Sequence, residues 1–72
     1  MKLFAVNGIV RSGDNRMTLT AHSGLYEALD DAHAIGLHTK WLQEEHPQAA
    51  IISIFANDIS SSAIAYAAKH GR

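Results

Sequence analysis

The sequence contains no cysteine, and this absence removes several kinds of chemistry at once. A chain without cysteine forms no disulfide, offers no thiolate nucleophile and holds no cysteine-ligated zinc or iron–sulfur centre. A lone core below about 70–80 residues seldom contributes more than a few kcal/mol of stability. With 72 residues and no disulfide, the chain is therefore expected to gain stability by self-association.

The sequence also lacks a charge excess of one sign and long hydrophobic runs. Six Lys/Arg oppose seven Asp/Glu, so no global positive field favours phosphate binding. No stretch approaches the roughly 20 apolar residues that span a bilayer. Residues 1–6 begin like a signal peptide, but Asn7 and Gly8 interrupt the run, which indicates a strand. We predict one cytoplasmic domain over residues 1–72, with no membrane partner.

The first half of the chain predicts a β-hairpin. Residues 3–11 are expected to pair with residues 16–22 across a four-residue loop, so that Val10 faces Met17. A tight turn at Asn7-Gly8 is the alternative, but its strands would have only about five residues. The preferred register places six apolar side chains on one face: Phe4, Val6, Val10, Met17, Leu19 and Ala21. The opposite face would carry Leu3, Ala5, Asn7, Ile9, Arg11, Arg16, Thr18, Thr20 and His22.

The remaining segments predict a helix, a strand and a second helix. The first helix is expected from Gly24 to Glu45, capped by Ser23 and ended before Pro47. Its predicted sheet-facing residues are Leu25, Ala28, Leu29, Ala32, Ile35, Gly36 and Thr39. Residues 49–56 are apolar at both odd and even positions, as in a strand that is covered on both faces. A last helix is expected after the serines at 60–62, with Ile64, Ala67 and Ala68 aligned.

These elements predict an α+β fold in the order strand, strand, helix, strand, helix. Its three-stranded sheet would carry the helices mainly on one face. The other face would then expose aliphatic side chains such as Leu3 and Ile9. A small monomer seldom leaves so much apolar surface uncovered, so we expect a homodimer.

Five histidines in so short a chain raise the question of metal binding. His33 and His38 are five positions apart and diverge on a helix, where ligand pairs need a spacing of three or four. Asp30 and His33 have that spacing but form an incomplete site. His22 and His46 would meet only through a tertiary contact. We predict no native metal site and no cofactor.

Catalytic motifs are also missing from the sequence. Ser60, Ser61 and Ser62 are not set in a Gly-x-Ser-x-Gly turn, and helix capping explains them. Neither type of glycine-rich phosphate loop occurs. The adjacent acidic pairs on the predicted helix diverge rather than face one substrate. We predict that the protein is not an enzyme.

The large side chains Tyr26, Leu37 and Trp41 fall outside the predicted sheet-facing stripe. Aromatic residues dominate binding hot spots, so these side chains are predicted interface anchors, together with Leu3 and Ile9. The predicted function is a small accessory or regulatory binding module. It would act through protein–protein contacts, as a homodimer and with a further protein partner.

The alternative prediction is a nucleic-acid-binding regulator. Arg11 and Arg16 would face each other across the hairpin, where like charges are destabilising unless an anion compensates them. Strand residues can contact phosphates or base edges in a groove. The nucleic-acid-binding residues under this hypothesis are Arg11, Arg16, Thr18, Thr20 and His22.

Overall fold

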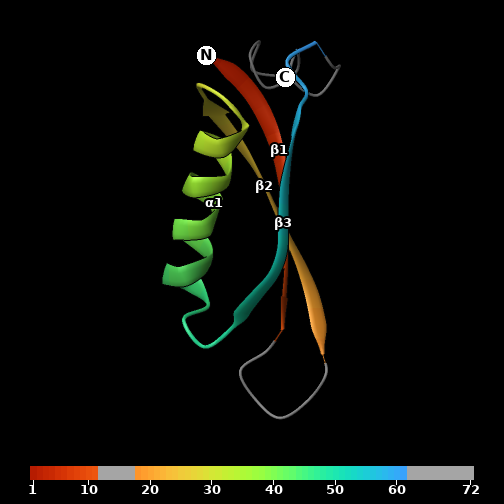
Figure 1. Ribbon diagram of the computed structural model, residues 1–72, viewed down its shortest axis with the longest axis vertical. Helices are drawn as coiled ribbons and strands as arrows, with labels where there is room; N and C mark the ends of the chain where they lie inside the picture. Colours follow the sequence, from red (N-terminus) through yellow and green to blue (C-terminus); the bar gives the residue numbers. More distant parts are fainter. Residues whose placement is uncertain (12–17, 62–72) are drawn as a thin grey trace, which may run out of the picture.

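Residues 1–11 and 18–61 are described by a computed structural model, and they form three strands and one helix (Figure 1). The elements are β1 (Lys2–Arg11), β2 (Leu19–Ala28), α1 (Asp31–Glu45) and β3 (Ala50–Asp58). The predicted small α+β fold with a three-stranded sheet is confirmed, but the described residues contain one helix and not the two that were predicted. The final predicted helix lies outside the described residues.

The sheet is antiparallel, with β1 in the centre and β2 and β3 at its edges. In Figure 1, α1 lies along one face of this sheet. The core lies between that face of the sheet and α1, and both contribute side chains to it. Its buried apolar residues are Phe4, Val6, Val10, Ala28, Ala34 and Leu42.

The predicted register of the hairpin is wrong. Val10 pairs with Thr20 instead of Met17, a shift of three residues. An odd shift exchanges the two faces of a strand. Leu19 and Ala21 therefore lie on the face away from α1, whereas Thr20 and His22 lie on the face beneath it. Phe4, Val6 and Val10 are buried against α1 as predicted.

The helix begins later than predicted, because the segment before it continues β2. Residues up to Ala28 pair with β1, which satisfies the hydrogen bonds of the central strand along its whole length. Asp30, and not Ser23, caps α1: its carboxylate accepts a hydrogen bond from the His33 amide at 2.8 Å. The predicted end at Glu45, before Pro47, is confirmed.

The side of α1 that faces the sheet also differs from the prediction. Ala34, His38 and Leu42 are its buried residues, whereas Ala32 and Gly36 of the predicted stripe are exposed. The prediction counted histidine as polar and included residues that belong to β2. For both reasons, the predicted stripe lies on a different side of the helix from the residues that are buried in the structure.

Strand β3 contains a β-bulge near its beginning. Ser53 pairs with Ile9 and Ile51 pairs with Val10, so Ile52 is the extra residue on the edge strand. Beyond the bulge, Ile54 faces α1 and Phe55 faces away from it. Because of the bulge, Ile51 and Ile54 lie on the same face of the sheet although their positions differ by an odd number.

The end of β3 is fastened to the start of β1 by a small polar turn. The Ser60 amide donates to the Asp58 carboxylate at 2.9 Å, and the Leu3 amide donates to the Ser60 hydroxyl oxygen at 2.9 Å. Hydrogen bonds from the Ser60 hydroxyl and amide, with a smaller attraction from Lys2, lower the pKa of Asp58. The charged form of Asp58 therefore stabilises this turn.

We expect this turn to lose stability in acid. A carboxyl whose pKa is lowered by folding contributes its full stabilisation above its ordinary pKa near 3.8. The contribution disappears as the pH falls through the lowered value. Asp58→Asn should reduce the melting temperature at pH 7, and the difference between variant and parent should shrink as the pH falls below 3.8.

Melting temperatures between pH 2 and pH 7 test this expectation. Glu44→Gln, which removes one exposed helix carboxylate, controls for the change in net charge. A constant difference between Asp58→Asn and the parent at every pH would contradict it.

Candidate functional site

Aromatic and histidine side chains gather on the helix side of the sheet, between β2 and the C-terminal half of α1. We call the group formed by His22, Tyr26, His38, Trp41 and His46 the histidine–aromatic cluster. His38 is its buried member, and it stacks on Trp41 with ring centroids 5.6 Å apart and an interplanar angle of 8°. The Tyr26 ring meets the His38 ring edge-on at 5.3 Å.

Both ring nitrogens of His38 are hydrogen-bonded. Nε2 lies 3.0 Å from the His22 carbonyl oxygen, and Nδ1 lies 2.7 Å from the Tyr26 hydroxyl. Because a carbonyl only accepts, Nε2 carries the proton. In the neutral ring Nδ1 then accepts the Tyr26 proton. His38 is therefore a satisfied core residue that joins α1 to β2.

Two glycines make this arrangement sterically feasible. A Cβ atom on Gly8 would lie 2.8 Å from Leu42 Cδ1 and 3.5 Å from the His38 ring. A Cβ atom on Gly24 would lie 2.8 Å from the Tyr26 ring. Gly8 thus lets α1 approach the central strand, and Gly24 leaves room for the tyrosine ring.

Tyr26 does not have the environment of an activated phenolate. Burial disfavours its charged form and raises its pKa above the ordinary value of 10.0. The phenol is therefore protonated near neutral pH and serves as a hydrogen-bond donor to His38.

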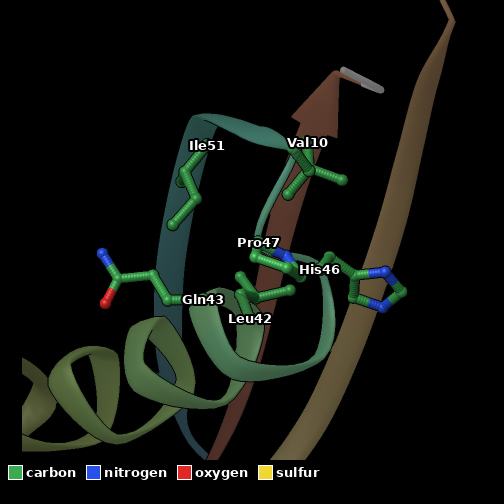
Figure 2. A pocket seen from close by; sticks show the side chains of 7 residues that line it. Val10, Leu42, Gln43, His46, Pro47 and Ile51 are labelled. Carbon is green, nitrogen blue, oxygen red and sulfur yellow. The ribbon is translucent and has the colours of Figure 1, made fainter. Parts of the chain in front are cut away.

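His22 and His46 are the partly exposed histidines of the cluster. Their ring centroids are 4.4 Å apart with an interplanar angle of 31°, and each ring meets Trp41 at a steep angle, at 6.1 Å and 5.8 Å. Figure 2 shows the His46 ring directed toward β2 and away from the other labelled side chains. The sequence could not show this contact, because it depends on the register of β2.

A small depression lies next to His46, between the end of α1 and the strands (Figure 2). Its volume is about 30 Å³, which suffices for one or two water molecules. Pockets for small organic ligands usually have volumes of about 300–1,000 Å³. This depression is therefore no substrate site. Its lining residues are Val10, Leu42, Gln43, His46, Pro47, Ala49 and Ile51.

The predicted interface residues divide between two surfaces. Leu37 and Trp41 lie on α1 and are 37% and 38% exposed. Leu3 and Ile9 lie on the sheet face away from the helix, where they are partly buried. Tyr26 is partly buried within the histidine–aromatic cluster. These five residues therefore do not form one continuous patch.

The residues of the nucleic-acid hypothesis are also divided. Arg11 lies on the face away from α1, whereas Thr20 and His22 lie on the face toward α1. Thr18 is exposed just before β2, and Arg16 lies outside the described residues. The predicted ribbon face that would have presented all five side chains together is therefore wrong.

The sheet face opposite α1, which we call the open face, carries apolar side chains that the described helix leaves uncovered. Leu25 is 50% exposed, Leu19 58% and Phe55 47%. At its centre the Ser23 hydroxyl donates to the Asn7 side-chain oxygen, so these two polar groups satisfy each other. The apolar residues of the open face are Leu3, Ala5, Ile9, Leu19, Ala21, Leu25, Ala50 and Phe55.

The fold and these surfaces define a small ββαβ domain of the α+β class. No protein-family model matches the sequence, and no curated protein or solved structure is significantly similar to it. Within residues 1–11 and 18–61, no helix is long and apolar enough to cross a membrane. Across the same residues, no group of three or more histidine, aspartate or glutamate side chains is arranged to hold a metal ion.

Proposed function

We propose that the protein is a non-enzymatic binding module that self-associates through the open face. The apolar character of this face is the observation that carries the proposal. In β2, the odd-numbered residues are the more apolar set, and they point away from the helix. Leu19, Ala21 and Leu25 therefore lie on the open face. A sheet that packs against one helix alone normally directs its apolar parity toward that helix.

The size of the open face fits an interface between two copies of this chain. Strands of about ten residues rise about 3.4 Å per residue and lie about 4.8 Å apart, so three strands present roughly 500 Å². Two such faces would bury about 1,000 Å², the lower limit for a specific interface. Two sheets stacked in this way would form a sandwich with one helix on each outer side.

The charges at the two ends of the open face are complementary under twofold symmetry. Arg11 pairs with Leu19 at one end of the hairpin, and Glu27 pairs with Leu3 at the other end. If two copies stack with their β1 strands antiparallel, Arg11 of each copy lies near Glu27 of its partner. A symmetric dimer repeats every contact, so this arrangement would form two ion pairs.

Light scattering or sedimentation over a concentration series tests the proposal. The parent protein should approach twice its 7.8 kDa mass as concentration rises. Leu25→Lys should hold it at the monomer mass, because a charge would be buried in the interface. Leu29→Lys, at an exposed site outside the sheet, is the matched control and should still dimerise. A parent that stays monomeric, or a Leu25→Lys variant that dimerises equally well, would refute self-association.

Charge reversal tests the orientation of the two copies. Arg11→Glu and Glu27→Arg should each weaken the dimer by repulsion, and the double variant should recover most of the lost affinity. Exposed pairs contribute about 0.2–1 kcal/mol each, so two symmetric pairs predict a change of several-fold in the dissociation constant. Absence of recovery in the double variant would rule out the antiparallel arrangement.

A further inference from the structure

We propose that His22 and His46 form a binding site for a divalent transition-metal ion of the copper–zinc class. The site lies in the histidine–aromatic cluster on the helix side of the sheet. It therefore does not depend on the self-association proposed for the open face. The two imidazoles come from β2 and from the residue that caps the C-terminus of α1.

The nitrogens of these two rings are the available ligands of the cluster. Both nitrogens of His38 are engaged by Tyr26 and by the His22 carbonyl. His33, elsewhere on α1, accepts the Leu29 amide on Nδ1 at 3.0 Å. By contrast, no hydrogen bond among the described residues involves a ring nitrogen of His22 or His46. A neutral imidazole with a free nitrogen lone pair is a common transition-metal ligand.

The separation of the two rings is close to that of two imidazoles on one ion. With metal–nitrogen bonds of about 2.0–2.1 Å, two imidazoles on one ion have ring centres roughly 4.5–5 Å apart. The observed separation is 4.4 Å with an interplanar angle of 31°, so both rings would turn about their χ angles and move slightly apart to direct one nitrogen each at a shared ion.

The backbones that carry both histidines are held in place. The His46 amide donates to the Leu42 carbonyl at 2.8 Å, and the His46 carbonyl accepts from the Ala49 amide at 3.0 Å. The His22 carbonyl accepts from His38, and its strand is paired with β1. Little conformational entropy is then lost at the backbone when an ion binds.

The donor set selects the class of ion. Two imidazoles without a carboxylate suit copper, nickel or zinc and are poor ligands for magnesium or calcium, which require oxygen. Two protein ligands leave the other coordination positions to water or to a donor from a bound molecule. The site is thus suited to exchangeable binding and not to a permanent structural metal.

The fluorescence of Trp41 should report whether a metal ion occupies the proposed site. Trp41 is the only tryptophan of the chain, and its ring lies about 6 Å from both histidine rings. Cu²⁺ is paramagnetic and quenches the fluorescence of a nearby indole. Titration of the untagged full chain with Cu²⁺ should give saturable quenching, and titration calorimetry with Zn²⁺ should give one ion per chain at this site.

Histidine variants decide whether the proposed residues hold the ion. His22→Gln and His46→Gln should each weaken binding about tenfold or more, a loss comparable to those seen when support of a metal ligand is removed. His33→Gln is the matched control and should bind like the parent. Because His46 follows the helix and is partly exposed, His46→Gln keeps the test valid if His22→Gln proves unstable. Absence of saturable quenching in the parent, or parent-like binding by His46→Gln, would overturn the proposal.

Discussion

Gly8→Val is expected to remove most of the stability of the domain. A single Cβ atom at this position would already lie 2.8 Å from Leu42 Cδ1, and Leu42 is fully buried. The side chain of Leu42 must therefore shift, and the space next to it is the small depression that it lines, which holds only one or two water molecules. Overpacking of this kind costs about 1–3 kcal/mol, and the branched valine should fall at the upper end. The total stability of a domain this small is only a few kcal/mol.

Denaturant unfolding followed by circular dichroism measures this effect, with two companion variants. Gly8→Ala should cost about 1 kcal/mol, because one methyl group displaces Leu42 less than valine does. Gly36→Ala has the opposite expectation. Nothing lies within 4 Å of its added Cβ, so the variant should gain roughly 0.5–1 kcal/mol from helix propensity. A Gly8→Val variant as stable as the parent would show that α1 does not pack closely on β1.

The alternation along β1 and the position of Pro47 were sufficient to predict much of the fold. Phe4, Val6 and Val10 share one parity, and all three are buried beneath α1. Pro47 excludes the preceding residue from the helical region, and the helix indeed ends at Glu45. Both signals are local, so a short stretch of sequence is enough to recognise each of them.

The register of β2 could not be predicted, because both parities of the strand carry apolar residues. One parity contains Leu19, Ala21 and Leu25, and the other contains Tyr26 and Ala28. Local patterning then favours the face with Leu19, Ala21 and Leu25, which the structure turns away from α1. The choice depends on long-range pairing with all ten residues of β1. The same pairing places Ser23 within a strand and leaves Asp30 to cap the helix.

The histidine–aromatic cluster was missed because hydropathy treats histidine as a surface residue. One signal was present: Ala34, His38 and Leu42 recur every four residues and share one side of a helix. A histidine between two apolar residues of such a row is a candidate for burial. Its partners, Tyr26 and the His22 carbonyl, depend on the true register and were beyond reach of the sequence.

Replacement of His38 is expected to have the second large effect, because the ring fills buried space and satisfies two polar groups. His38→Ala should cost about 2–4 kcal/mol, since it leaves a cavity and removes both hydrogen bonds. His38→Leu retains most of the volume and should cost about 1–3 kcal/mol through the unpaired partners alone. Denaturant unfolding of the two variants separates packing from hydrogen bonding.

A double-mutant cycle with Tyr26→Phe isolates the bond between Tyr26 and His38. Tyr26→Phe alone should cost about 1 kcal/mol, because the Nδ1 acceptor of the buried ring loses its donor. When His38→Leu is already present, no acceptor remains, so the same change should cost little. A coupling energy of roughly 1 kcal/mol is therefore expected. Additive costs for the two changes would mean that the 2.7 Å contact does not stabilise the fold, and that His38 joins α1 to β2 by packing alone.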